Sequence, residues 1–187
     1  MALLPFNISR KKKIKVIIVG GGYAGLAALT NLLQFSPETD VTLIDPHEHH
    51  LKITHLHETF RYPLTDLLAP FADICKRFEC RFIQANVDFD PDTLSSYQDK
   101  RQLIVNEEAL DFDYLIIATG CNPIDTENEN AKETLSLSDF IQTSGSDLLT
   151  QRLNISSSPE CVISIVGGGA TGIQFLFEIH QFLNRIK

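Results

Sequence analysis

Residues 15–25 read Lys-Val-Ile-Ile-Val-Gly-Gly-Gly-Tyr-Ala-Gly, a short run of β-branched residues followed at once by glycines. Apolar residues then recur at helical spacing, so the stretch predicts a strand, a tight turn and a helix. The glycines have the spacing G-x-G-x-x-G, in which the first makes the turn, the second admits a pyrophosphate and the third lets the helix pack on the strand. N–H groups at the start of such a helix attract anions. The residues expected to contact a dinucleotide are therefore Gly20, Gly22, Tyr23, Ala24 and Gly25.

A second buried strand is expected at Val41–Ile44, after a helix-breaking stretch at 36–39. It ends at Asp45, twenty residues after Gly25, where a carboxylate accepts hydrogen bonds from a ribose. The alternative interpretation is an acidic residue that opens a turn beside Pro46. We favour the ribose contact, because strand, loop, helix and acid occur in the required order.

The remaining pattern predicts further elements along the chain. Up to residue 120 they are a helix over Pro63–Arg77, a strand over Arg81–Val87, strands Leu94–Gln98 and Gln102–Val105 of a small antiparallel meander, and an apolar strand Tyr114–Ala118 closed by Thr119 and Gly120. After a polar segment with a helix at Asp139–Leu153, they are a strand Cys161–Val166, a loop Gly167-Gly168-Gly169-Ala170-Thr171-Gly172 and a helix to Lys187. Strand, glycine loop and helix thus recur with an offset of 147 residues.

The expected fold class is therefore α/β: a Rossmann-like domain with a β-meander, followed by the opening strand, loop and helix of a second Rossmann domain. We place the first domain at 14–125, a connector at 126–160 and the incomplete second unit at 161–187. The chain stops fifteen residues past Gly172, so we expect a truncated second unit.

Composition and charge exclude several classes of function and location. The net charge of −8 repels phosphate backbones and argues against nucleic-acid binding. The apolar N-terminal stretch is too short for a signal peptide, and no apolar run approaches the ~18 residues that a membrane span needs. Four cysteines without an export signal favour reduced thiols. We expect a cytoplasmic protein, at most peripheral to a membrane.

The two glycine loops, with Leu110–Gly120 between them, resemble the two-dinucleotide flavoproteins, that is, FAD-dependent pyridine nucleotide oxidoreductases and among them type II NADH:quinone oxidoreductases. The resemblance implies that the first loop holds FAD, with Asp45 on the adenosine ribose and the Val87 backbone near the adenine. It implies contacts to the flavin's phosphate and ribityl region from Ala118, Thr119 and Gly120. It implies an NAD(P)H pyrophosphate site at Gly167, Gly169 and Gly172.

The chain also departs from this family. Gln174 stands where a glutamate near the nicotinamide is common, and Phe175, Leu176 and Phe177 stand where small residues are usual. Relatives are longer and return to the FAD domain with a later segment that this chain lacks. The resemblance implies hydride transfer from NAD(P)H to FAD and then to a quinone or another small acceptor, with no catalytic acid or base that we can name. The alternative is a non-catalytic nucleotide-binding fragment that depends on a partner chain for the missing half.

Two side-chain clusters leave other chemistry open. Five histidines, His47, His49, His50, His55 and His57, fall within eleven residues and suggest a metal site. No ordered ligand framework accompanies them, so we favour a polar loop beside the flavin and predict no metal. Cys75 and Cys80 have the C-x4-C spacing of the disulfide reductases, but they lie much later in the chain than that redox pair, so we do not assign them its role.

Overall fold

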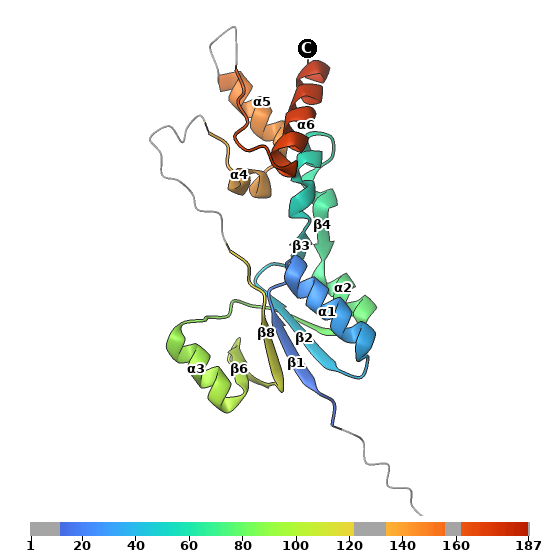
Figure 1. Cartoon of the computed structure of the whole chain (residues 1–187), viewed down its shortest axis with the longest axis vertical. Coiled ribbons are helices and arrows are strands. Elements are labelled where there is room, and N and C mark those ends of the chain that lie inside the picture. The colour runs from blue at the N-terminus through green and yellow to red at the C-terminus, as the bar shows by residue number, and fades with distance from the viewer. Residues whose placement is uncertain (1–11, 122–133, 156–161, 187) are drawn as a thin grey trace, which may run out of the picture. The chain divides into compact units, whose positions relative to one another are not determined.

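The computed structural model describes residues 12–121, 134–155 and 162–186 (Figure 1). The chain forms two compact units. Unit 1 comprises residues 1–48 and 70–120, and unit 2 comprises residues 49–69 and 121–187. The first glycine loop belongs to unit 1 and the second to unit 2.

Unit 1 is built on a four-stranded sheet in the order β5-β2-β1-β8. The strands are β1 (Lys15–Val19), β2 (Asp40–Asp45), β5 (Arg81–Gln84) and β8 (Tyr114–Ile117), and each neighbouring pair is parallel. Helix α1 (Tyr23–Phe35) links β1 to β2 (Figure 1). Because all four strands run the same way, their carboxyl ends meet at one edge of the sheet. The expected α/β class with a Rossmann-like parallel sheet is confirmed.

Both faces of this sheet are buried, as the continuous apolar strands predict. Side chains alternate along β1, so Val16 and Ile18 point to one face, and Ile17 and Val19 to the other. The first face packs under α1 and α2 (Phe71–Phe78). The second packs under α3 (Pro91–Lys100) and the hairpin of β6 (Gln102–Val105) and β7 (Glu108–Asp111), through Tyr97, Leu103, Val105 and Leu110.

The predicted meander is partly wrong. Residues 94–98 lie in α3, whose N-cap Asp90 accepts hydrogen bonds from the N–H groups of Asp92 and Thr93, both at 3.1 Å. Pro91, with its fixed φ, occupies the first helical position. The strand at 102–105 is confirmed, and its antiparallel partner is β7. The meander is therefore a single hairpin preceded by a helix.

The single helix expected over Pro63–Arg77 is also wrong. The chain instead forms η2 (Leu64–Leu67), β4 (Leu68–Pro70) and then α2, and β4 pairs with β3 (His49–Leu51). Pro70 is the reason, because a proline disfavours helical backbone in the preceding residue and has no N–H to donate. Helix α2 begins directly after it.

Other predicted boundaries shift. The strand over Arg81–Val87 ends at Gln84, the strand over Tyr114–Ala118 ends at Ile117, and the helix over Asp139–Leu153 is divided into α4 (Leu137–Gln142) and α5 (Gly145–Ile155). Cys161 lies outside the described residues, and the described part of its predicted strand, 162–166, is not a strand. A strand requires a neighbour for its N–H and C=O groups, and the described residues provide none here.

Unit 2 has its own core, centred on the aromatic ring of Phe60 at the end of η1 (Ile53–Phe60). Its ring centroid lies 6.2 Å from that of Phe140, 6.0 Å from Phe175 and 5.7 Å from Phe182. Helix α6 (Ala170–Ile186) supplies the last two rings. Phe175 and Phe182 are buried in this core, at 8% and 7% exposed.

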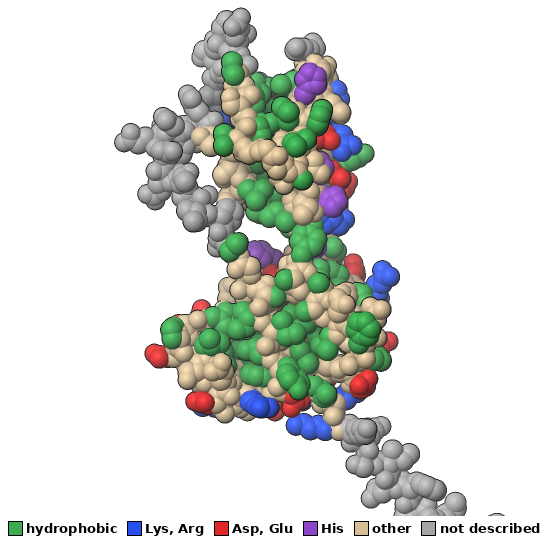
Figure 2. Space-filling view, viewed as in Figure 1, with side chains coloured by type: hydrophobic (Ala, Val, Ile, Leu, Met, Phe, Trp, Pro, Cys, Tyr) green, Lys and Arg blue, Asp and Glu red, His purple; other side chains and the backbone are tan. Residues whose placement is uncertain are grey.

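Polar contacts attach α6 to η1 as well. Arg61 pairs with Glu178 at 2.9 Å, and the Arg185 guanidinium donates to the Phe60 carbonyl oxygen at 2.9 Å. The opposite side of the helix remains apolar and exposed, with Phe177 at 61%. Figure 2 shows hydrophobic side chains on the visible surface of both units. Among the helices of the described ranges, none is long and apolar enough to cross a membrane.

Phe60→Ala should destabilise unit 2 by about 3–5 kcal/mol, because it removes a ring that three other aromatic rings contact. Hydrogen exchange followed by mass spectrometry should show faster exchange in α5 and α6, with β1 and β2 unchanged. Phe177→Ala on the exposed side of α6 is the matched control and should alter exchange little. Equal protection of α6 in Phe60→Ala and the wild type would contradict this core.

Candidate dinucleotide site

The first glycine loop lies at the carboxyl edge of the parallel sheet of unit 1. The Gly20 N–H donates to the Ile44 carbonyl oxygen at 2.8 Å, and the Ala118 N–H donates to the Val19 carbonyl oxygen at 2.7 Å. These bonds extend the pairing of the strands beyond their last residues. The edge therefore collects the loop after β1, the acid that ends β2 and the Ala118-Thr119-Gly120 turn after β8.

Two of the loop glycines are required by close packing. Gly20 has φ +103°, and a Cβ there would overlap the Ala118 carbonyl oxygen. A Cβ at Gly25, in the first turns of α1, would overlap the Gly20 carbonyl oxygen. These positions match the turn and the helix-packing roles that the spacing predicts.

Gly22 is different from both. Apart from Gly22 itself and its two chain neighbours, no described residue has an atom within 4 Å of the position that a Cβ at Gly22 would occupy. The loop backbone is therefore open on this side, at the start of α1. The first turn of α1 contains no acidic side chain to offset the partial positive charge of the helix N-terminus. Tyr23 and Ala24 are the first residues of that turn, and both are exposed.

The Asp45 carboxylate contacts the loop directly. Its Oδ2 accepts a hydrogen bond from the Gly21 N–H at 2.7 Å, and its Oδ1 accepts one from the His47 N–H at 2.8 Å. The His47 ring Nδ1 lies 3.0 Å from the same Oδ1. A carboxylate offers about four acceptor positions, so this arrangement leaves capacity for a ribose hydroxyl. Asp45 thus holds the loop. The ribose contact predicted from its spacing stays a prediction.

Sequence analysis missed two neighbours of this loop. Phe71, fully buried in α2, places its ring against Gly21, where a Cβ would overlap it. His47 was predicted only as a member of the histidine cluster. The glycine spacing does not identify either residue, because Phe71 reaches the loop from another element and the His47 contact depends on the turn after β2.

The other predicted contacts of unit 1 lie at or near this edge. Ala118 and Thr119 place backbone atoms against Gly20, and Gly120 follows with φ +72°. Val87 lies three residues beyond the end of β5 and packs partly buried on the core face that contains Ile17 and Ile44. The structure therefore brings Gly20, Asp45 and Ala118 together. Val87 lies in the segment that follows β5, the strand next to β2.

The second glycine loop repeats the local geometry of the first. Gly167 has φ +116°, and a Cβ at Gly172 would overlap its carbonyl oxygen, as Gly25 would overlap that of Gly20. Like Gly22, Gly169 has no described atom within 4 Å of a Cβ position. In contrast to Gly20, Gly167 also meets no described atom there. The second loop thus has the glycine conformation without a packed sheet edge.

Four of the five clustered histidines are divided between two elements. His49 and His50 lie in β3, whereas His55 and His57 lie in the 3-10 helix η1 with their rings stacked at 6.3 Å. In the parts of the chain that the structure describes, no group of three or more His, Cys, Asp or Glu side chains is placed to hold a metal ion.

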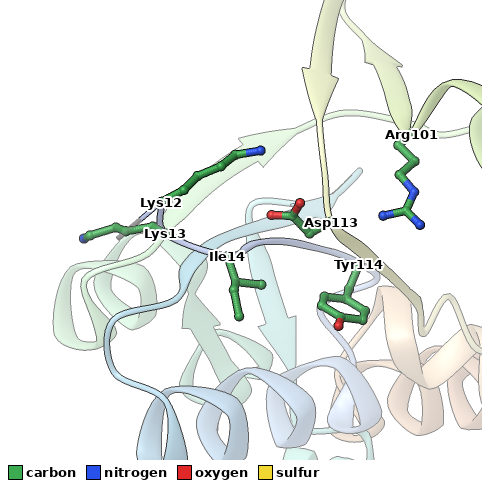
Figure 3. Close-up of a pocket in the computed structure, with 6 residues that line it drawn as sticks. All are labelled: Lys12, Lys13, Ile14, Arg101, Asp113 and Tyr114. Carbon is green, nitrogen blue, oxygen red and sulfur yellow. The ribbon is translucent and has the colours of Figure 1, made fainter. Parts of the chain in front are cut away.

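A hollow of about 330 Å³ lies at the opposite, amino edge of the sheet. Figure 3 shows its lining, with Asp113 between the two lysines and Arg101; the residues are Lys12, Lys13, Ile14, Arg101, Asp113 and Tyr114. Asp113 accepts the Lys15 N–H at 2.8 Å, which attaches the start of β8 to the start of β1. The hollow contains no glycine loop or helix N-terminus, so we do not assign the dinucleotide to it.

Residues 14–186 match the family described as "Pyridine nucleotide-disulphide oxidoreductase". The chain belongs to this family. It is 29% identical over 177 residues to the type II NADH:quinone oxidoreductase of Staphylococcus aureus (strain NCTC 8325 / PS 47), a match that covers 88% of this chain and 42% of that protein. The chain thus spans less than half the length of the curated relatives that it matches.

Solved structures share the fold. The sulfide:quinone oxidoreductase of Aquifex aeolicus superposes with a TM-score of 0.69 at 21% identity, over 92% of this chain and 40% of that one. The NDH2 of Plasmodium falciparum in complex with NADH superposes with a TM-score of 0.60 at 22% identity, over 93% and 38%. At these identities the likeness establishes the fold.

Gly25→Ala should prevent the native loop from forming, because its Cβ would overlap the Gly20 carbonyl oxygen. The substitution should lower the free energy of unfolding by more than about 3 kcal/mol, at the upper end of single-substitution effects. Gly22→Ala should change the free energy of unfolding by less than about 1 kcal/mol, because its Cβ meets no described atom. Thermal unfolding followed by circular dichroism compares the two. Equal destabilisation by both substitutions would contradict the described loop.

Proposed function

We propose that unit 1 binds FAD, with the pyrophosphate at the open backbone of Gly22 and the N–H groups of Tyr23, Ala24 and Gly25. The observation that carries this proposal is the contrast within the loop: Gly20 and Gly25 are close-packed, whereas Gly22 is open at a helix N-terminus. N–H groups at a helix N-terminus and the helix dipole together favour a diphosphate there. Family membership and the S. aureus relative support a dinucleotide of this kind.

The neighbouring residues fit the rest of the cofactor in this proposal. The Asp45 carboxylate accepts a hydrogen bond from a hydroxyl of the adenosine ribose and keeps the hydrogen bond from the Gly21 N–H. The Val87 backbone lies beside the adenine, and Ala118, Thr119 and Gly120 lie beside the second phosphate and the ribityl chain. Gly167, Gly169 and Gly172 bind the NAD(P)H pyrophosphate through the same loop conformation.

The proposed reaction is oxidation of NAD(P)H with a quinone or another small molecule as the final acceptor, as the names of the matched relatives suggest. The flavin ring of bound FAD supplies the hydride-accepting chemistry. The residues of this chain bind and orient the two dinucleotides. Gln174 cannot take up a proton, and we assign no acid or base among the described residues.

A second candidate is a nucleotide-binding module that requires another polypeptide for activity. Residues 162–166 form no strand, and Val162 and Val166 are 89% and 99% exposed. Ile173, Leu176 and Phe177 of α6 are also exposed. Apolar side chains that are clustered and exposed mark interaction surfaces. A strand supplied by a partner beside residues 162–166 would cover Val162 and Val166. In this case the chain binds FAD but oxidises NADH only with the partner present.

FAD titration of the apoprotein, followed by flavin fluorescence, tests the first loop. Gly22→Ala should weaken binding by about tenfold or more, equivalent to ~1.4 kcal/mol, because the added methyl occupies the space of the phosphate. Gly168→Ala is the matched control, because its Cβ also meets no described atom but lies in the other loop. Unchanged affinity in Gly22→Ala would exclude FAD from this loop.

NADH oxidation with a soluble quinone separates the two candidates. Turnover by the purified chain with bound flavin supports the oxidoreductase, whereas bound flavin without turnover supports the partner-dependent module. If the chain is active, Gly169→Ala should raise the KM for NADH by about tenfold, since a methyl there blocks the approach to the loop backbone, and should leave FAD affinity unchanged. An unchanged KM would remove the NAD(P)H assignment from the second loop.

A further inference from the structure

The hollow at the amino edge of the unit 1 sheet is lined by cationic side chains that form no ion pair. Lys12 and Arg101 both line it, and neither pairs with an acidic side chain of residues 12–121, 134–155 or 162–186. The ion pair of this edge is made by Lys15, whose Nζ lies 3.8 Å from Asp111. The chain as a whole has a net charge of −8, so these cations give the hollow a local positive potential that attracts anions.

The backbone of Arg101 is fixed at the rim of this hollow. Arg101 follows the last residue of α3 in the left-handed conformation, with φ 50° and ψ 40°. Its N–H donates to the Tyr97 carbonyl oxygen at 2.9 Å, and its own carbonyl oxygen accepts the Phe112 N–H at 3.0 Å. These bonds attach Arg101 to α3 and to the segment between β7 and β8. The exposed guanidinium therefore extends from an anchored position.

The Asp113 carboxylate offers a hydrogen-bond acceptor in the same hollow. Its Oδ2 accepts the Lys15 N–H at 2.8 Å, whereas its Oδ1 has no hydrogen-bond partner among the described residues. Figure 3 shows Asp113 between Lys12 and Arg101. A carboxylate between two cations suits a ligand that has both an anionic group and hydroxyl donors.

An aromatic ring completes the lining. Tyr114 and Ile14 are 63% and 48% exposed, and in Figure 3 both lie below Asp113. The Tyr114 ring therefore offers a face on which a flat ligand ring stacks. Cations, a carboxylate acceptor and a stacking surface are thus found in one hollow of about 330 Å³, at the small end of the range for ligand sites.

We propose that this hollow is a binding site for a nucleoside monophosphate. The phosphate pairs with the Arg101 guanidinium, which binds phosphate oxygens in a bidentate manner, and Lys12 is the second cation. A ribose hydroxyl donates to Oδ1 of Asp113, and the base stacks on Tyr114. One nucleotide has all three of the chemical groups that the lining recognises.

The site is separate from the first glycine loop. Strand β1 begins at Lys15 beside the hollow and ends at Val19 before the loop, and a strand rises about 3.3 Å per residue. The two ligands therefore lie at opposite edges of one sheet and do not compete for the same groups. The proposal does not depend on FAD binding at the first loop.

The test is a ¹⁵N–¹H NMR titration of the full chain with adenosine monophosphate. We expect saturable shifts at the backbone amides of residues 13–14, 101 and 113–114. Inorganic phosphate and adenosine, which each lack part of the ligand, should bind at least about tenfold more weakly, because each loses either the stacking or the charged hydrogen bonds.

Three variants test the assigned contacts. Arg101→Gln should weaken binding by about tenfold or more, since it removes the charged hydrogen bonds to the phosphate. Lys13→Gln is the matched control: it removes an equal charge from a side chain that extends away from the others in Figure 3, and should weaken binding less than about threefold. Tyr114→Thr keeps a β-branched residue in β8 and should weaken binding by about fivefold or more through the loss of stacking.

An unshifted spectrum, or shifts confined to residues 21–25, would overturn the proposal. So would inorganic phosphate that binds as tightly as adenosine monophosphate, or equal weakening by Arg101→Gln and Lys13→Gln, since either result indicates a general attraction of anions. All three substituted side chains are exposed, and unchanged amide shifts away from the hollow check that each variant is folded. Failure of FAD binding would leave the shifts at the hollow in place, because the first loop lies at the other edge.

Discussion

The contact of the Asp45 carboxylate with the Gly21 N–H joins the loop after β1 to the end of β2. It depends on the parallel pairing of these strands, since Val19 lies opposite Ile44 in the sheet register. Packing of Gly20 on Ala118 attaches the same loop to β8. A turn constrained from both sides keeps Gly22 open. The sequence places no acidic side chain in the first turn of α1. We propose that these constraints on the backbone allow the loop to accept a diphosphate.

The second glycine loop shows how much of this geometry is local. Gly167 and Gly172 adopt the same close approach as Gly20 and Gly25, although no described strand pairs with residues 162–166. The spacing of the glycines and the start of a helix are therefore sufficient for the turn. What the second loop lacks in the described residues is an acidic side chain and a neighbouring strand beside it. Comparison of the two loops shows that the glycine spacing determines the turn, whereas the sheet adds the neighbouring strand and the acidic side chain beside the first loop.

The sequence predicted the features with short-range causes. The strand, loop and helix at 15–35, Asp45 at the end of β2, and the Ala118-Thr119-Gly120 turn all follow from periodicity and glycine spacing. Helix α3 was predicted as a strand although Asp90-Pro91 is a helix-start signal, and Pro70 was not used to divide the helix before it. The core of unit 2 could not be predicted, because Phe60 and Phe175 are far apart in the chain. The contact of Phe71 with the loop depends on tertiary packing, whereas the contact of His47 with Asp45 depends on the conformation of the turn after β2.

The most direct measurement is a ¹⁵N–¹H NMR titration of the labelled chain with FAD. The account predicts the largest shifts at the backbone amides of residues 21–25, with smaller changes at Thr119 and Gly120 and none at Cys80 on the opposite sheet edge. It also predicts that the amides of residues 167–172 respond to NADH instead. Unshifted amides at residues 21–25 under saturating FAD would contradict the account.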